Sequence, residues 1–158
     1  MNITLPTIHA TALLLGGMGV LIRGTSGAGK SRLALALLDR EGCQPSQRAY
    51  LQRDAPHALI SDDQVHLEQG NGGLIARSPS SLSGRLEVRG IGIVHMPWVE
   101  AARMQLIVDL TSVDLVPRMP ESNEERLQGC LLTRIHVPIG DLAHQCLLVR
   151  CALSLLTR

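Results

Sequence analysis

The chain has 158 residues, of which 45% are hydrophobic, and its formal net charge at neutral pH is +1. This length suits one domain with a substantial core, so we expect a single domain over residues 1–158. Phenylalanine is absent, and there is neither a block of basic residues nor a set of stacking aromatics, which argues against nucleic-acid binding.

Hydropathy argues against a membrane or secreted protein, and the spacing of the cysteines argues against a zinc site or a disulfide framework. The apolar runs are shorter than a bilayer requires, and the N-terminus lacks a signal-peptide pattern, so we expect a cytoplasmic protein without a membrane partner. Reduced thiols, rather than a zinc site or a disulfide framework, are expected because no C-x-x-C spacing occurs. The cysteines are Cys43, Cys130, Cys146 and Cys151.

The first part of the chain predicts strands that lead into a helix. Residues 4–15 predict one or two strands, and a glycine-rich turn then leads into an apolar strand over residues 20–23. A helix is predicted from Lys30 to about Asp39. Residues 41–56 are polar and lack periodicity, so we expect a surface excursion there.

A match to G-x-x-x-x-G-K-[ST], the phosphate-binding P-loop, lies between that strand and that helix. Glycines let backbone N–H groups converge on an anion, and the following helix adds the positive end of its dipole. Lys30, the only lysine in the chain, would reach the β- and γ-phosphates, while the hydroxyl of Ser31 would bind Mg²⁺. The loop consists of Gly24, Thr25, Ser26, Gly27, Ala28, Gly29, Lys30 and Ser31.

Strands predominate in the second part of the chain. Residues 111–128 are polar and contain two prolines, which predicts an ordered loop or a short helix. Asp141 can cap a final helix that runs to the end of the chain. Strands are predicted over residues 57–61, 65–67, 74–76, 84–94, 104–110 and 131–139.

Three carboxylates could serve the P-loop. Asp62 and Asp63 end an apolar strand, where a carboxylate of a Mg²⁺ site can lie, although such a pair can also form only a turn. Successive side chains on a strand face opposite ways, so the two should differ in role. Glu87 lies between Arg85 and Arg89, and a surface ion-pair ladder is the alternative to a metal ligand there.

Two further residues carry no specific signal by themselves. His9 is typical of a half-buried histidine on a strand, and Arg126 of an ordinary surface arginine. The residues alone therefore predict a magnesium-dependent nucleotide phosphotransferase whose substrate is not identified.

Residues 86–94 read L-E-V-R-G-I-G-I-V, which resembles the L-E-[IV]-R-G-[LI]-G-I signature of the HPr kinase/phosphorylase family. The order of the other features agrees, with His9 before the P-loop, the acidic pair after it, and Arg126 followed by leucine in a late loop. The resemblance covers nearly the whole chain. It implies an α/β fold with a P-loop kinase core resembling phosphoenolpyruvate carboxykinase, in which helices flank a strand-rich sheet.

The same resemblance implies an activity. A member of this family uses ATP and Mg²⁺ to phosphorylate a serine of HPr, the small phosphocarrier of the sugar phosphotransferase system. It also removes that phosphate with inorganic phosphate and releases pyrophosphate, and pyrophosphate is expected as an alternative donor to ATP. Known members assemble as hexamers, so a homo-oligomer is expected.

Family roles can be transferred to matching positions of this chain. The resemblance implies that Asp63 takes the seryl proton and returns it in the reverse reaction. His9, Lys30 and Arg126 would stabilise phosphate charge. Residues 134–139 lie where the family has positions important for dephosphorylation.

The resemblance also implies a metal site and shows some departures. Ser31 and Glu87 would hold Mg²⁺, with Asp62 as a possible further ligand. By resemblance, we expect a short proteobacterial form that lacks the family's usual N-terminal domain, so the partner would be HPr or a relative from a nitrogen system. Arg32 stands where the family often has glutamate.

Two other functions stay open at this point. One is a nucleotide-sensing regulatory module with a P-loop but without transfer activity. The other is a small-metabolite kinase, which would need a mobile arginine-rich lid over the phosphates, and no segment of the sequence stands out as such a lid.

Overall fold

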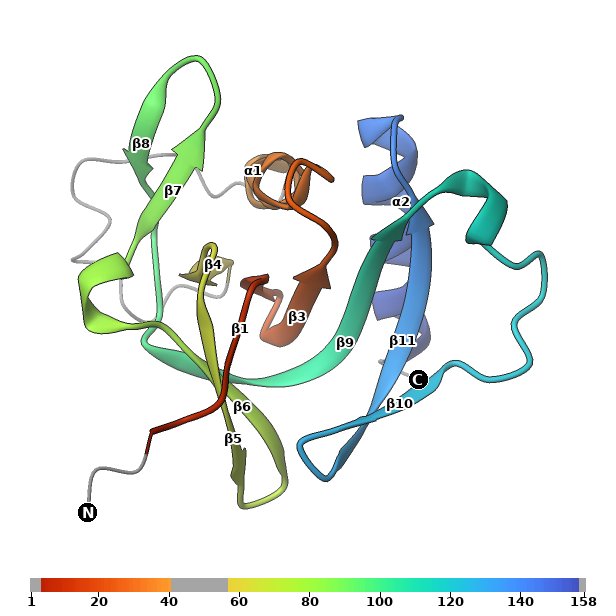
Figure 1. Cartoon of the computed structure of the whole chain (residues 1–158), viewed down its shortest axis with the longest axis horizontal. Coiled ribbons are helices and arrows are strands. Elements are labelled where there is room, and N and C mark those ends of the chain that lie inside the picture. Colours follow the sequence, from red (N-terminus) through yellow and green to blue (C-terminus); the bar gives the residue numbers. More distant parts are fainter. Residues whose placement is uncertain (1–3, 41–56, 157–158) are drawn as a thin grey trace.

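The computed structural model describes residues 4–40 and 57–156, which adopt an α/β architecture (Figure 1). These residues contain the helices α1 (Lys30–Arg40) and α2 (Leu142–Leu156), a nine-stranded sheet and a two-stranded sheet. The α/β class predicted from the sequence is confirmed. The predicted surface excursion over residues 41–56, together with Cys43, lies outside the described residues.

The large sheet has the strand order β1-β5-β6-β9-β3-β2-β4, and β11 pairs with another part of β9 and with β10. In Figure 1, β9 curves from its start, which pairs with β6, to its later part, which pairs with β11. Strands β3 and β11 both run parallel to β9, whereas the other pairings are antiparallel. The strands are β1 (Thr7–Ile8), β2 (Thr11–Leu15), β3 (Met18–Arg23), β4 (Ala58–Ser61), β5 (Val65–Gly70), β6 (Gly73–Arg77), β9 (Ala101–Thr111), β10 (Glu124–Leu127) and β11 (Cys130–Pro138).

Both faces of the central strands are buried. On one face, Leu33 and Leu37 of α1 and Val149 of α2 pack in one cluster with Leu106 of β9. Ile107, the next residue of β9, belongs to a second cluster that includes side chains of β5 and β6. Since neighbouring strand residues face opposite ways, two-sided burial explains why the middle of β9 is continuously apolar.

The two helices begin as the sequence predicts. The first follows the P-loop directly, and the second is capped by Asp141, whose Oδ1 accepts a 3.1 Å hydrogen bond from the backbone N–H of His144. None of the helices in the described part of the chain is long and apolar enough to cross a membrane.

A separate β-hairpin, β7 (Arg85–Val88) and β8 (Gly92–His95), lies beside α1 (Figure 1). A short 3-10 helix, η2 (Ser80–Leu82), precedes it. Leu86 is fully buried in the helix-side cluster, whereas Glu87 is exposed. Strand alternation therefore directs the glutamate of the L-E-V-R-G stretch outward.

One strand differs from the prediction. The sequence predicts a loop or short helix for residues 111–128, and a short helix, η3 (Val113–Leu115), is present, but β10 also forms there. Its sequence Glu-Glu-Arg-Leu lacks the apolar alternation that identifies a strand. Pairing with β11 and ion pairs of Glu125 stabilise it instead, and neither can be read from local sequence.

Candidate active site

A cleft of about 460 Å³ lies between the P-loop, the acidic pair after β4 and the β7–β8 hairpin. Its volume falls in the range of small-molecule sites, about 300–1,000 Å³. The structure thus brings together residues that are far apart in the sequence. Nine of the candidate site residues line it: His9, Ser26, Gly27, Gly29, Lys30, Ser31, Asp62, Asp63 and Glu87, whereas Gly24, Thr25 and Ala28 of the P-loop do not.

The P-loop has the backbone shape that its glycines permit. Gly27 and Gly29 have φ values of 82° and 98°, in the left-handed region that disfavours residues with a Cβ. The N–H of Ala28 donates a 3.0 Å hydrogen bond to the carbonyl of Thr25, which closes the turn between them. The loop then continues directly into the N-terminus of α1, where backbone N–H groups favour an anion.

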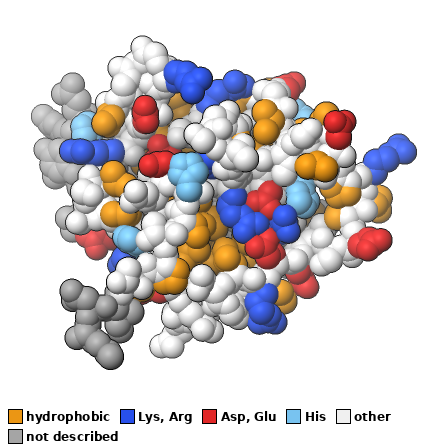
Figure 2. All heavy atoms as spheres, viewed as in Figure 1, with side chains coloured by type: hydrophobic (Ala, Val, Ile, Leu, Met, Phe, Trp, Pro, Cys, Tyr) orange, Lys and Arg blue, Asp and Glu red, His pale blue; other side chains and the backbone are white. Residues whose placement is uncertain are grey.

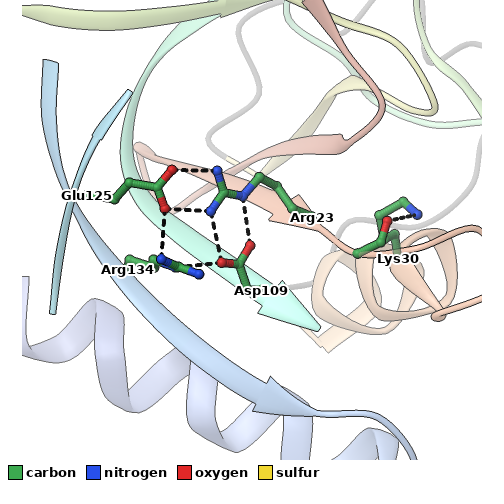
Figure 3. Close-up of polar contacts among 6 residues, drawn as sticks. Arg23, Lys30, Asp109, Glu125 and Arg134 are labelled. Atoms are coloured by element: carbon green, nitrogen blue, oxygen red, sulfur yellow. Dashed lines mark hydrogen bonds and ion pairs between the residues drawn. The ribbon is translucent and has the colours of Figure 1, made fainter. Parts of the chain in front are cut away.

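Lys30 is buried and lies across the loop to which it belongs. Its Nζ donates to the carbonyl oxygens of Gly24 and Thr25 at 2.9 and 3.0 Å, as Figure 3 shows in part. Burial lowers the pKa of this ammonium, while the charges of Asp62 and Asp63 act in the opposite direction. An ammonium has three donors, so this side chain can exchange a carbonyl for a phosphate oxygen.

Asp62 is buried and faces the P-loop. The hydroxyl of Ser31 donates to both of its carboxylate oxygens, at 2.8 Å to Oδ1 and 3.0 Å to Oδ2. Thr11 donates a second hydroxyl hydrogen bond to Oδ1 at 2.8 Å. Asp62 is thus held next to the hydroxyl that P-loop proteins use to bind Mg²⁺.

Asp63 has the opposite character. Its side chain is 65% exposed, and its Oδ1 lies 2.9 Å from Nδ1 of His9. Its φ is 72°, and the N–H of Gln64 donates to the carbonyl of Asp62 at 2.9 Å, the pattern of a γ-turn centred on Asp63. This conformation costs on the order of 1–3 kcal/mol and directs the carboxylate into the open cleft. The predicted difference between Asp62 and Asp63 is therefore present in their exposure and contacts.

Glu87 enters the cleft from the hairpin. Within the described residues, it forms no ion pair with Arg85 or Arg89, so the predicted alternative of an ion-pair ladder is wrong. Its backbone N–H lies 3.5 Å from Oδ2 of Asp62. Glu87 therefore lies near the Ser31–Asp62 pair, and its role as a metal ligand stays a prediction.

Arg126 is not among the residues that line this cleft. It is exposed on β10 and donates to the carbonyl of Gly129 at 3.1 Å, within its own hairpin. Its neighbour Glu125 faces the other side of β10 and contacts Arg23. The predicted contact of Arg126 with phosphate thus stays a prediction.

The donor atoms near Ser31 suit Mg²⁺. They are oxygens of one hydroxyl and up to two carboxylates, from Ser31, Asp62 and Glu87. No group of three or more His, Cys, Asp and Glu side chains suited to a metal occurs among residues 4–40 and 57–156. Mg²⁺ commonly binds through one or two carboxylates and completes its shell with phosphate and water, so this sparse set fits it.

A cluster of four charged residues beside the P-loop was not found by sequence reasoning (Figure 3). Arg23, the residue before the loop, donates to Asp109 at 2.7 and 2.8 Å and to Glu125 at 2.8 and 2.6 Å. Arg134 of β11 donates to Asp109 at 2.6 Å and lies 3.2 Å from Glu125. We call these four residues the charge cluster.

The charge cluster joins four strands of the large sheet, β3, β9, β10 and β11. Burial alone would raise the pKa of Asp109, but Arg23 and Arg134 outweigh it and the pKa is lowered. The hydrogen bond from Arg23 likewise lowers the pKa of Glu125, against a smaller effect of burial. Asp109 lies near the carboxyl end of β9, which runs parallel to the P-loop strand β3. Ligand sites of α/β sheets lie at that end of the strands, so an aspartate near the end of a predicted strand was the signal in the sequence that could have identified this residue.

Acidic and basic side chains of the described residues are interspersed on the face drawn in Figure 2. A compact group of both signs lies beside hydrophobic side chains there, and no extended surface of one sign is visible on that face. Charge on this face is therefore balanced locally, as in the charge cluster.

Comparison with known proteins identifies relatives of the whole described fold. A family model described as "HPr Serine kinase C-terminal domain" matches residues 4–152. A solved structure titled "Structure of the Hpr(Ser) kinase/phosphatase from Coxiella burnetii" is similar with a TM-score of 0.76 and 30% sequence identity. That match covers 97% of this chain and 99% of the other.

Curated relatives are longer than this chain. The HPr kinase/phosphorylase of Streptococcus thermophilus is 31% identical over 145 residues, which cover 84% of this chain and 42% of the relative. The HPr kinase/phosphorylase of Clostridium tetani is 30% identical over 119 residues, 75% of this chain and 33% of the relative. The chain therefore spans less than half the length of these curated relatives.

Proposed function

Because the chain belongs to the family described as HPr Serine kinase C-terminal domain, we propose that it transfers phosphate from ATP to a serine of an HPr-type phosphocarrier protein. We also propose the reverse reaction, in which inorganic phosphate removes the seryl phosphate and pyrophosphate is released. The observation that carries this proposal is the cleft that joins a P-loop to an exposed carboxylate, Asp63.

The P-loop would hold the phosphates of the nucleotide. Its N–H groups and the N-terminus of α1 favour a polyphosphate chain, and Lys30 can turn from Gly24 and Thr25 toward it. In the reverse direction, the same groups would hold inorganic phosphate and then pyrophosphate. Pyrophosphate would also fit this loop as a donor in place of ATP.

Asp63 would prepare the serine. It is exposed to a protein substrate, and His9 holds one of its oxygens at 2.9 Å. The phosphoryl transition state is loose, so the hydroxyl needs a positioned acceptor for its proton more than it needs a strong base. In the reverse direction, Asp63 would return that proton to the seryl oxygen, while His9 and Lys30 would stabilise charge on the phosphate.

Ser31, Asp62 and Glu87 would hold Mg²⁺, which would neutralise phosphate charge when bound. We also propose that Arg126 contributes to phosphate binding and that the protein is a homo-oligomer, a hexamer by family resemblance. Sedimentation velocity would test the assembly.

The test of this function is a phosphorylation assay run in both directions. The protein is incubated with radiolabelled ATP, Mg²⁺ and the HPr of the same organism, and phosphoserine is identified by mass spectrometry. Purified phospho-HPr is then incubated with inorganic phosphate, and pyrophosphate is measured. Pyrophosphate replaces ATP in a third reaction.

The Lys30→Ala variant serves as the control that lacks phosphate binding. We expect wild-type protein to produce phosphoserine and pyrophosphate, and Lys30→Ala to produce neither. If wild-type protein binds ATP but yields neither product, the enzyme proposal is wrong and a nucleotide-sensing module is the better account. Transfer to a small metabolite instead of HPr would favour a metabolite kinase.

A further inference from the structure

Thr11, the first residue of β2, is fully buried, and its hydroxyl points toward the acidic pair. It donates a 2.8 Å hydrogen bond to Oδ1 of Asp62, which is itself only 7% exposed. A buried hydroxyl costs free energy unless it is hydrogen-bonded, and this carboxylate is its partner. The contact links residues 51 positions apart in the sequence.

The two carboxylates of the acidic pair are held by one short stretch of chain. His9 contacts Asp63 and Thr11 contacts Asp62. His9 lies in the bend between β1 and β2 and lines the cleft, whereas Thr11 begins β2 and is fully buried. The strand β2 lies between β3, which leads into the P-loop, and β4, which leads into Asp62. Thr11 is therefore at the junction of both segments.

The hydrogen bonds of Asp62 are unequal between its two oxygens. Oδ1 accepts from Thr11 and Ser31 at 2.8 Å each, which occupies its two lone-pair directions. Oδ2 has longer contacts, 3.0 Å from Ser31 and 3.5 Å from the N–H of Glu87. Oδ2 is thus the oxygen with capacity left for a cation or for one of its water ligands.

We propose that Thr11 is a positioning residue that holds Oδ1 of Asp62 and so presents Oδ2 to a divalent cation beside Ser31. The inference rests on the proposed function, because it assumes that Mg²⁺ binds next to the P-loop. Groups that hydrogen-bond to a metal ligand orient it, and their loss commonly weakens metal affinity about 10–100-fold. Thr11 would act in this way through its hydroxyl alone.

Two substitutions separate the effect of the shape of Thr11 from the effect of its hydroxyl. Valine keeps the branched shape that suits a strand but removes the donor, whereas serine keeps the donor and removes a methyl group. Thr111→Val is a matched control, since Oγ1 of Thr111 is buried without a hydrogen-bond partner in the described part of the protein. That residue does not line the cleft.

The experiment measures Mg²⁺ affinity by calorimetric titration in the presence of a non-hydrolysable ATP analogue. We expect Thr11→Val to weaken Mg²⁺ binding by about tenfold or more. Thr11→Ser and Thr111→Val should stay within about threefold of wild type, since each retains the Asp62 hydrogen bond. Affinity for the analogue in EDTA, and the thermal unfolding midpoint, report whether the P-loop and the fold are intact.

Two results would overturn the proposal. One is a Thr11→Val protein that binds Mg²⁺ as wild type does, and the other is equal weakening by Thr11→Ser, which would indicate shape rather than the hydroxyl. If Thr11→Val does not fold, the Mg²⁺ affinities of Thr11→Ala and Thr11→Ser are compared instead, because these two variants also differ in the hydroxyl. Absence of transfer to HPr in wild type would refute the proposed function alone, because these titrations do not depend on turnover.

Discussion

At the scale of single residues, adjacent carboxylates acquire different properties from their surroundings. Asp62 is buried against Ser31 and Thr11, whereas the side chain of Asp63 is 65% exposed in a γ-turn. A metal ligand needs a fixed position, while a carboxylate that meets a serine of another protein needs access. The burial of Asp62 and the exposure of Asp63 therefore suit the proposed roles of metal ligand and proton acceptor, respectively.

Replacing Asp63 by asparagine tests the proposed proton acceptor. Asn keeps the size and hydrogen-bonding reach toward His9 but cannot accept the seryl proton, so we expect transfer to fall at least about a hundredfold. Nucleotide affinity should be unchanged. The matched control is Asp114→Asn, an exposed aspartate of η3 outside the cleft. A variant that transfers phosphate at the wild-type rate would refute the assigned role.

Glu87→Gln tests the carboxylate that the hairpin contributes. Loss of one charge near Ser31 should raise the Mg²⁺ concentration required for half-maximal transfer by about tenfold, with little effect on folding. Glu68→Gln is the control, because Glu68 instead pairs with Arg77 at 2.8 Å. If Glu87→Gln lowers only the thermal unfolding midpoint, the side chain is structural and does not bind metal.

At the scale of elements, the charge cluster attaches β10 and β11 to the P-loop strand. Arg23 connects Asp109 of β9 with Glu125 of β10, and Arg134 closes the cluster from β11 (Figure 3). The side chain of Asp109 is 11% exposed, so its hydrogen bonds are only weakly screened by water. The position of β10 relative to the loop therefore depends on these contacts.

Glu125→Gln should lower the free energy of unfolding by about 1–3 kcal/mol at pH 7, because Arg23 loses a charged partner. Glu124→Gln is the matched control, since Glu124 is the exposed neighbour on the same strand. Urea denaturation of both variants and of wild type measures the difference. Equal loss in the two variants would mean that the cluster contributes nothing specific.

The same cluster predicts a dependence of stability on pH. Its carboxylates have lowered pKa values in the folded protein, so the unfolded chain binds more protons in acid. Their contribution is complete above the ordinary carboxyl pKa, about 4, and is lost as the pH falls below it. The difference between wild type and Glu125→Gln should therefore shrink between pH 7 and pH 3. A constant difference would contradict this account.

At the scale of the whole molecule, binding at the cleft should be visible in global stability. The P-loop joins β3 to α1, and both pack in the main core cluster, so a ligand held there favours the folded state. Phosphate groups that bind only the folded chain raise its unfolding free energy by about 2.7 kcal/mol at a hundred times the dissociation constant.

We therefore expect ATP, and separately pyrophosphate, to raise the thermal unfolding midpoint in a concentration-dependent way. For a domain of this size, that free energy corresponds to a shift of roughly 5–10 °C. Scanning calorimetry of wild type and of Lys30→Ala measures the effect. A variant without Lys30 that shows the same shift would place the ligand outside the P-loop.

Local sequence predicted most of the elements and the phosphate site. The P-loop and the cap at Asp141 are contiguous patterns, and each has one favoured backbone shape, whereas the acidic pair was identified from its place at the end of a predicted strand. The strand β10 was missed because its charged residues lack strand periodicity. The alternative interpretation of Glu87, a surface ion-pair ladder with Arg85 and Arg89, was wrong because spacing along a strand does not show which side chains form contacts.

The sequence by itself determined a P-loop between a strand and a helix, since its glycines permit the local backbone shape and the side chains of Lys30 and Ser31 act from the same short stretch. Only the tertiary structure decided which distant side chains meet. Thr11 and Asp62 are 51 positions apart, and Arg23 and Glu125 are 102 apart. Such pairs depend on strand order and register, which many weak contacts determine together, and no local pattern encodes them.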